Sequence, residues 1–195
     1  MAEHQEKGAK RDAVIVLLDE AGFSEHPLVS ATWAPIGQTP VLAQAGSWKK
    51  LTVIGALTLQ PSGRVNEQFQ ILRRNATVMD FVNFLLEIRR RYHKPVIVVW
   101  DRLRRHTQTQ ELMKFCDAHW IEFHQLPSYA PDLNPFEGLW SCTKRGALAN
   151  FAPHNLDELE PVVEAVLQEK KQQQSLLKGL FAGAGLDPTP GRELI

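Results

Sequence analysis

The sequence predicts an α/β protein in which a mixed sheet is flanked by helices. Two continuous apolar runs rich in β-branched residues, Ala13 to Leu18 and Pro95 to Trp100, have the pattern of strands that are buried on both faces. The first run is followed by further strand patterns, and the second lies between segments with helical spacing. Strands first, and then strands alternating with helices, is the order typical of a mixed sheet with helices on its faces.

The first part of the chain is expected to form strands. Residues 1–12 are polar and are predicted to be a disordered lead, and the strand at 13–18 is predicted to end in a turn at Gly22. Three further segments have strand patterns: 30–35, 50–59 and 65–72. Because the turn sequence Gln60-Pro61-Ser62-Gly63 separates the last two, an antiparallel meander is expected there.

The second part of the chain adds helices. From Asn75 the apolar residues follow helical spacing to about Tyr92, with Asn75 or Thr77 as the N-cap. A short helix is expected at 109–119 and a strand at 120–126. Beyond Asn134 a helical pattern continues to about Leu148, and a long helix capped by Asn155 or Asp157 is expected from Leu156 to about Leu180. The tail at 182–195 is rich in Gly and Pro and is expected to be disordered, which leaves one folded domain over 13–181.

Composition and charge limit the protein's class. Hydrophobic residues make up 44% and charged residues 23%, which are values typical of a globular protein. Net charge is zero, with 22 basic and 22 acidic residues, so any basic surface must be local. No apolar run reaches 18 residues and the N-terminus lacks the apolar stretch of a signal peptide. Cys116 and Cys142 have neither disulfide-framework nor zinc-site spacing, and a cytoplasmic protein without membrane contact is expected.

A proline-rich stretch, Leu126 to Trp140 (LPSYAPDLNPFEGLW), predicts a rigid approach to a helix. Its three prolines disfavour helix until Asn134, which stands where an N-cap belongs, with Pro135 at the first helical position. Glu137 then falls on the first turn. We therefore expect this stretch to deliver the Glu137 carboxylate to a fixed place.

Two further carboxylates follow the two apolar runs, Asp19 after VIVLL and Asp101 after VIVVW. If these strands are parallel neighbours, their carboxyl ends share one edge of the sheet, where ligand sites of open α/β sheets tend to lie. Three carboxylates from three elements suit a hard cation such as Mg²⁺ or Mn²⁺. A pair of such ions would offset the repulsion among the acids and would support phosphodiester cleavage.

Structural explanations for the same acids remain open on the residues alone. An Asp at the end of a strand is often the first residue of a loop, and Glu137 has the spacing of a capping box with Asn134. Glu20, Asp117 and Asp132 are other available carboxylates.

Three segments in order, LLDEAGF, VVWDRLRRH and LPSYAPDLNPFEGLW, resemble the catalytic domain of DDE-type transposases in the insertion-sequence branch of the Tc/mariner superfamily. Glu137 follows Asp101 by 36 positions, close to the spacing in that family. The resemblance extends from about Val14 to Leu180. It implies an RNase H-like fold with a mixed five-stranded sheet that carries the acids at its centre.

The resemblance also implies a chemistry. Asp19, Asp101 and Glu137 would hold two Mg²⁺ ions, with Mn²⁺ as a substitute, for cleavage at transposon ends and then attack of the freed 3′-hydroxyl on a target duplex. It further implies a homodimer during reaction and an enzyme located at the bacterial nucleoid. Complete transposases of this type resemble a helix-turn-helix module followed by the catalytic domain. Only about a dozen residues precede the first strand here, so that module is expected to be absent from this chain. A second reading frame joined by frameshifting, which would make the module a separate partner, a truncated gene copy and an excised piece of a longer protein remain open as explanations.

Several basic residues are candidate DNA contacts. Arg102 stands where the family often has Asn, so its role is open between a phosphate contact and none, and His106 matches the family's usual histidine, which could also be a packing residue. The DNA-contact candidates are Arg102, Arg105, His106, Lys144 and Arg145. Trp33 and Trp48 could stack on a base, although core or interface packing explains them too, and Trp140 is expected to pack its helix onto the sheet.

Two other functions remain compatible with the sequence. One is a truncated or domesticated copy that binds DNA or a partner without cutting. The other is an RNase H-like nuclease that acts on a hybrid or a junction.

Overall fold

The computed structural model describes residues 12–43, 48–127 and 133–186. Its strands are β1 (Val14–Ser24), β2 (Lys50–Leu59), β3 (Val65–Leu72), β4 (Val96–Trp100) and β5 (Ile121–Gln125). Its helices are α2 (Val78–Tyr92), α3 (Arg104–Phe115), α4 (Pro135–Cys142), the π-helical η2 (Thr143–Ala147), α5 (Leu156–Gln172) and α6 (Gln174–Gly183). Within the described residues, no helix combines the length and the apolar character needed to cross a membrane.

The five strands form one mixed sheet in the order β3-β2-β1-β4-β5. β1 is central and pairs antiparallel with β2 and parallel with β4, which in turn pairs parallel with β5. β2 and β3 form the expected antiparallel meander. The predicted mixed five-stranded sheet with flanking helices is therefore confirmed, and so is the expectation that the two apolar runs are parallel neighbours.

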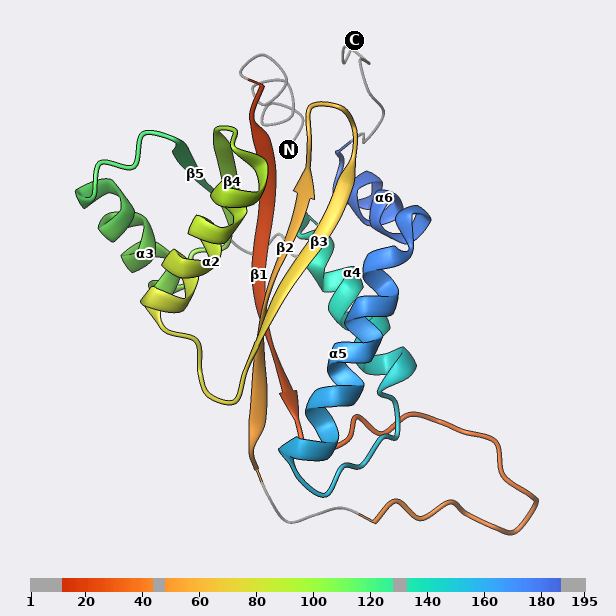
Figure 1. The fold of residues 1–195 in the computed structure, drawn as a ribbon. Helices are drawn as coiled ribbons and strands as arrows, with labels where there is room; N and C mark the ends of the chain where they lie inside the picture. Colours follow the sequence, from red (N-terminus) through yellow and green to blue (C-terminus); the bar gives the residue numbers. More distant parts are fainter. Residues whose placement is uncertain (1–11, 44–47, 128–132, 187–195) are drawn as a thin grey trace.

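Helices cover both faces of the sheet, as Figure 1 shows, with α2 and α3 on one side and α4, α5 and α6 on the other. Because side chains alternate along a strand, β1 contributes Ile15 and Leu17 to the core beneath α4, α5 and α6. Val14, Val16 and Leu18 belong to the second core, which is covered by α2. The same alternation decides which face of the sheet Asp19 occupies.

β1 extends further than its sequence predicts. The turn expected at Gly22 is wrong, because β2 pairs with β1 as far as Ser24, opposite Lys50. Asp19 is therefore an interior strand residue opposite Gly55. Cross-strand pairing along the whole of β2 overrides the turn propensity of Asp19-Glu20-Ala21-Gly22.

The strand expected at 30–35 is also wrong. Residues 25–43 and 48–49, which we call the arm, connect β1 to β2 without regular strand pairing and project away from the body in Figure 1. The arm contacts the body at Leu28, whose carbonyl accepts a hydrogen bond from Asn150 N (3.1 Å) in an isolated bridge with Ala149. Ser30 N also donates to Asn150 Oδ1 (2.8 Å).

The expected capping residues of the helices agree with the structure better than the expected helix lengths do. Thr77 caps α2 in a capping box with Asp80, and Asn155 caps α5 by accepting from Glu158 N. α3 begins at Arg104, earlier than expected, and the long C-terminal helix is divided at Gln173 into α5 and α6. The folded region also passes the expected boundary at 181, since Leu186 packs in the core with 1% exposure.

Candidate active site

The parallel register of the two central strands places Asp19 beside Asp101. Leu17 pairs with Val99 in the last pair of this ladder. Asp19 lies two residues further along β1, and Asp101 follows Trp100 directly, just beyond the end of β4. Ile15 and Leu17, like Ile97 and Val99, face the core beneath α4. Alternation then directs Asp19 to that same face. Asp101, just beyond β4, is near enough for its charge to act on Asp19, and its own carboxylate is bonded to His106 of α3.

α4 holds Asp19 through two hydrogen bonds. Asn134 Nδ2 donates to Asp19 Oδ2 (3.0 Å), and Trp140 Nε1 donates to the same oxygen (3.1 Å). The other oxygen, Oδ1, accepts from the Glu20 amide (2.8 Å). Asp19 is 8% exposed, so its carboxyl group is fixed by neighbours from β1 and from α4.

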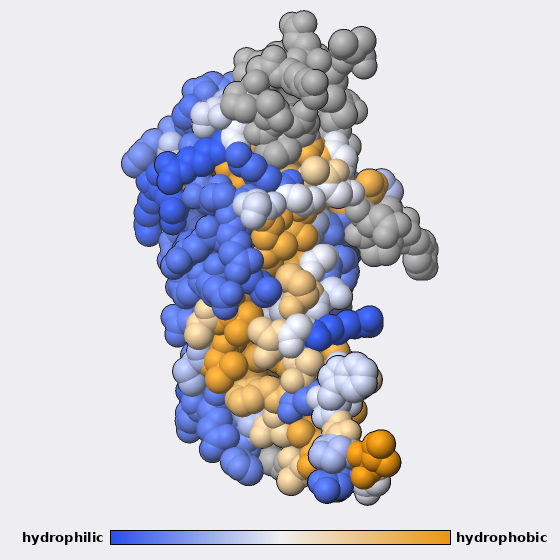
Figure 2. Space-filling model, turned by 90° about the vertical axis from the view of Figure 1, so that its right-hand side faces the viewer, coloured by the Kyte–Doolittle hydropathy of each residue, from blue (hydrophilic) through white to orange (hydrophobic). Residues whose placement is uncertain are grey.

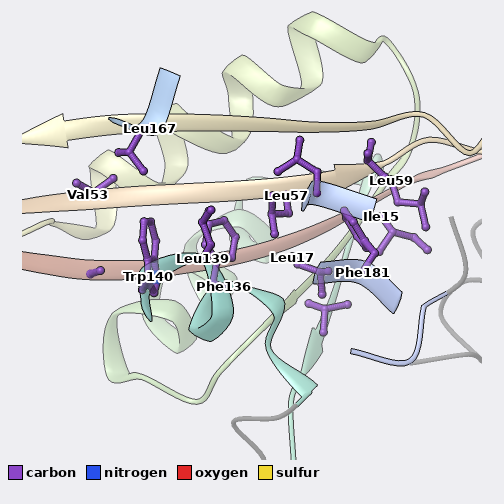
Figure 3. Close-up of a cluster of buried hydrophobic side chains, with 14 of the residues drawn as sticks. Ile15, Leu17, Val53, Leu57, Leu59, Phe136, Leu139, Trp140, Leu167 and Phe181 are labelled. Atoms are coloured by element: carbon purple, nitrogen blue, oxygen red, sulfur yellow. The ribbon is translucent and has the colours of Figure 1, made fainter. Parts of the chain in front are cut away.

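The docking of α4 depends on Gly55. Phe136 and Trp140 stack with ring centroids 4.9 Å apart and point from α4 against the sheet (Figure 3). A Cβ atom at Gly55 would lie 2.5 Å from Phe136 Cε1 and 3.0 Å from Trp140 Cη2. Only glycine therefore allows α4 to approach β2 this closely, directly across the ladder from Asp19. The expected packing of Trp140 onto the sheet is confirmed.

The ionisation of Asp19 reflects this environment. Burial raises the pKa of its carboxyl group from 3.8 to about 6, and the negative charge of Asp101 adds to the rise. Hydrogen bonds from the Glu20 amide, Trp140 and Asn134 act in the opposite direction. The two aspartates therefore repel each other, and a cation between them would relieve that repulsion.

Asp101 is held by the start of α3. Its Oδ1 accepts from Leu103 N (3.0 Å) and lies 2.6 Å from His106 Nδ1. Half-burial of Asp101 opposes ionisation, but the hydrogen bonds of His106 and Leu103 prevail and lower its pKa. His106 is itself fully buried, stacked on Trp100 with centroids 4.6 Å apart.

Glu137 lies on the first turn of α4, as expected. Asn134 is the N-cap and its Oδ1 accepts from Phe136 N (3.1 Å). Glu137 takes no part in a capping box, and among the described residues its exposed carboxylate accepts no hydrogen bond. Glu137 interacts electrostatically with Lys144 of η2. Burial lowers the pKa of Lys144, and the charges of Glu137 and Asp19 oppose that fall.

The donor chemistry of this region fits a hard divalent cation. Asp19 and Asp101 supply carboxylate oxygens that already interact electrostatically, and Glu137 supplies a third, unbonded carboxylate. The three acids are not gathered into a closed site, because no group of three His, Cys, Asp or Glu in the described ranges is close enough to hold a metal ion. Asp19 and Asp101 are the pair that the structure brings together.

A comparison with family models finds that residues 14–160 match the DDE superfamily endonucleases. The chain belongs to this family. The match covers all three acidic positions and the whole sheet. A comparison with curated proteins finds no significant match.

Solved structures similar to this DDE endonuclease agree on the fold. The Mos1 transposase paired-end complex with left transposon end aligns with a TM-score of 0.64 at 17% identity, over 94% of this chain and 56% of the other. The Mos1 mariner paired-end complex with Mn gives the same values. The Mos1 transposase catalytic domain with raltegravir and Mg aligns at 0.56 with 14% identity, over 94% of this chain and 84% of the other. The chain thus spans a little more than half of the Mos1 chains in the paired-end complexes.

The candidate DNA contacts of this DDE endonuclease differ in their surroundings. Arg102 and Arg145 are exposed, and Arg105 forms an ion pair with Glu20. A direct DNA contact by His106 is contradicted, because its side chain is 0% exposed between aromatic rings and bonds Asp101 instead. Lys144 is half-buried, with its ammonium 5.1 Å from the centre of the Phe23 ring.

The alternative carboxylates have other surroundings. Glu20 is engaged by Arg105, and Asp117 lies in an exposed turn beside His119 (2.9 Å). Asp132 lies outside the described residues, as do Ser128 to Pro131 of the proline-rich stretch.

Sequence reasoning missed three residues of the site. Asn134 was expected to cap α4 but not to hold Asp19, and Trp140 was expected only to pack. Gly55 had no expected role. All three roles follow from the placement of α4 across β1 and β2, and the one available signal was a glycine within the otherwise apolar run of β2.

Proposed function

We propose that this chain is a transposase catalytic domain that performs metal-dependent DNA strand cleavage and strand transfer at transposon ends. The observation that carries the proposal is that Asp19 and Asp101, beside and just beyond the parallel pairing of β1 and β4, interact electrostatically, while Asp19 is hydrogen-bonded to α4, the helix that bears Glu137. Membership of the DDE endonuclease family supports it. So do the similar Mos1 structures, which contain a transposon end, Mn or Mg.

Asp19, Asp101 and Glu137 are the proposed metal ligands, for two Mg²⁺ or Mn²⁺ ions. When bound, such ions supply Lewis-acid chemistry that favours the attacking oxygen and stabilises the leaving one. The residues of the chain fix the carboxylates: α4 holds Asp19, and His106 with the Leu103 amide holds Asp101. The low pKa of Asp101 keeps that group ionised at neutral pH.

The proposed reaction has two displacements at phosphorus. In the first, a water oxygen attacks and the 3′ oxygen leaves, which frees a 3′-hydroxyl at the transposon end. In the second, that 3′-hydroxyl attacks a phosphodiester of the target duplex and displaces its 3′ oxygen. No covalent enzyme intermediate is required, because water and the DNA hydroxyl are the nucleophiles.

The test is a nicking assay with Mn²⁺ and a duplex that carries the end of the chain's own element. Asp101→Asn preserves shape and removes the charge, and we expect it to abolish nicking. Asp117→Asn makes the same change in an exposed turn at φ 55°, a conformation that Asn tolerates, and should leave nicking unchanged. Equal nicking by wild type and Asp101→Asn would show that the acids are wrongly assigned.

We propose that DNA approaches the basic residues near the acids, with the exposed Arg102 and Arg145 as phosphate contacts and the half-buried Lys144 interacting electrostatically with Glu137. Each phosphate contact contributes to the salt dependence of binding. We expect Arg145→Gln to reduce the slope of log Kd against log salt by about 1. Lys114→Gln, an exposed cation on α3, is the matched control and should not change the slope.

We also propose that two copies act together during the reaction. The arm exposes large apolar side chains, with Trp33 at 100%, Val41 at 92% and Ile36 fully accessible. Core packing of Trp33 and Trp48 is thereby contradicted, although Trp48 stacks on His26 (3.8 Å between centroids). Figure 2 views the molecule from the side of α5 and shows hydrophobic residues gathered in a band beside the hydrophilic surface. Such exposed apolar area is typical of an interaction surface.

Sedimentation of the chain with an end duplex tests this pairing. The double variant Trp33→Ser and Ile36→Ser should yield complexes with one protein chain, whereas wild type yields two. Phe115→Ser removes an 88% exposed ring from α3 and is the matched control. A two-chain complex that survives in the arm variant would contradict the assignment of the arm.

Recognition of the element's terminal sequence is proposed to come from a helix-turn-helix module distinct from this domain. The proposed place of action is the bacterial nucleoid, where both substrates lie. Binding of the domain to end duplexes and to shuffled duplexes should therefore be equally tight. A clear preference for the end duplex would contradict the need for a separate module.

A further inference from the structure

We propose that Trp140, together with Asn134, is a positioning residue that fixes the Asp19 carboxylate in its cation-binding orientation. The inference rests on the proposed function in one respect, that Asp19 is a metal ligand. It goes beyond that function because it assigns a role to two side chains that carry no charge.

The first step concerns the two carboxylate oxygens of Asp19, one of which already accepts two hydrogen bonds. A carboxylate oxygen has two lone pairs, and Asp19 Oδ2 accepts from both Asn134 Nδ2 (3.0 Å) and Trp140 Nε1 (3.1 Å). Oδ1 accepts from the Glu20 amide alone among the described residues. Oδ1 therefore retains the lone pair that is available to a cation.

The second step is the rigidity of the donor. The Trp140 indole is 5% exposed, stacks on Phe136 and meets the Phe23 ring edge-on with centroids 5.9 Å apart. Because Gly55 allows these rings to lie against the sheet, the indole N–H is held in place by packing on several sides. A donor fixed in this way restrains the side-chain rotation of Asp19.

The third step links two of the acids. Asn134 uses Oδ1 to cap α4, through Phe136 N, and Nδ2 to hold Asp19. The helix that carries Glu137 is thus fastened at its N-cap and at Trp140 to the carboxylate of β1. Groups that orient a metal ligand in this way commonly change metal affinity by about 10–100-fold when removed.

The alternative role for Trp140 is core packing alone. The variant Trp140→Phe distinguishes that role from the positioning of Asp19. The variant keeps a ring against Phe136 and loses the N–H donor. Asn134→Ser keeps a capping oxygen and loses the amide donor, so it tests the same claim where Trp140→Phe does not fold. Trp120→Phe makes the same ring exchange at a half-buried indole that packs beside Arg89 (5.7 Å), away from the acids.

The probe is Mn²⁺ alone, with its dissociation constant measured by electron paramagnetic resonance on the metal-free chain. We expect Trp140→Phe and Asn134→Ser each to weaken Mn²⁺ binding about tenfold, with Trp120→Phe and wild type equal. In nicking assays the same two variants should lower kcat and leave KM for DNA unchanged. Mn²⁺ affinities in both variants equal to that of wild type would overturn the positioning role.

A second measurement needs no metal. The indole N–H resonance of Trp140 should move in Asp19→Ala, because its hydrogen-bond acceptor is gone, and the resonance of Trp120 should not. An unchanged Trp140 resonance would overturn the inference. Equal Mn²⁺ binding by wild type and Asp19→Ala would instead refute the metal assignment of the proposed function, and the Trp140 resonance distinguishes the two failures.

Discussion

Replacement of Gly55 by alanine tests the close approach of α4 to the sheet. The added Cβ would lie 2.5 Å and 2.9 Å from two carbon atoms of Phe136, closer than real Cβ contacts allow. Overpacking of this kind costs about 1–3 kcal/mol, whereas alanine in place of glycine within a strand otherwise gains roughly 0.5–1 kcal/mol. Phe136 is 0% exposed, so its ring has little freedom to move aside. We expect a net loss of about 1–2 kcal/mol in the free energy of unfolding.

Gly22→Ala is the matched control. Gly22 also lies within a strand, and the nearest atom to its added Cβ would be Lys50 Cδ at 3.6 Å, an ordinary contact. Urea unfolding of both variants gives the comparison, provided that the m-values equal that of wild type. We expect Gly22→Ala to be at least as stable as wild type. Equal stability of the two variants would refute the packing argument.

Three further changes have defined outcomes. Burial raises the pKa of Glu67 from 4.5 to about 7, with Lys171 and Lys170 opposing the rise, so the wild-type free energy of unfolding should fall by about 3 kcal/mol as pH rises from 4.5 to 7. Glu67→Gln should remove that fall in urea titrations at several pH values, and a retained fall would mean that another group titrates. Thr77→Ala removes the N-cap of α2 and should lower the thermal midpoint by an amount equivalent to about 1 kcal/mol. An unchanged midpoint would show that the cap is dispensable. Leu167→Ala, at 0% exposure, should cost about 2–5 kcal/mol in urea, whereas Leu103→Ala, at 41%, should stay within about 0.5 kcal/mol.

The sign of the Glu67 effect follows from proton binding. Between pH 4.5 and 7 the folded protein holds a proton on Glu67 that the unfolded chain has released. Stability that is fully present below pH 4.5 is therefore lost as pH rises through this range. Both Glu67 side-chain oxygens are buried without a hydrogen-bond partner among the described residues, which is why the charged form is disfavoured.

The sequence predicted the elements whose pattern is local. Strand patterns marked β2 and β4 at nearly their observed bounds, Asn134 was placed correctly as the cap of α4, and Asn155 was one of the two caps expected for α5. These features depend on a residue and its close neighbours in the chain. The resemblance of three short motifs then supplied the family.

The failures involve partners that are distant in the chain. Asp19 was expected at the end of a strand, yet β1 continues to Ser24 because β2 pairs with it there. The arm resembled a strand at 30–35 but has no neighbour to pair with in the described structure. For His106 the sequence left packing and a DNA contact both open, and its burial depends on the packing of α3 against Trp100.

The attachment of α4 to β1 has a consequence for how sequences of this kind can diverge. Asp19 and Glu137 are joined through a single eight-residue helix, so their separation is set by that docked helix and not by the connection that precedes it. Lengthening or shortening the connection between β5 and α4 should therefore be tolerated by the catalytic geometry. The number of residues between the second and third acids should then be free to vary without loss of the chemistry.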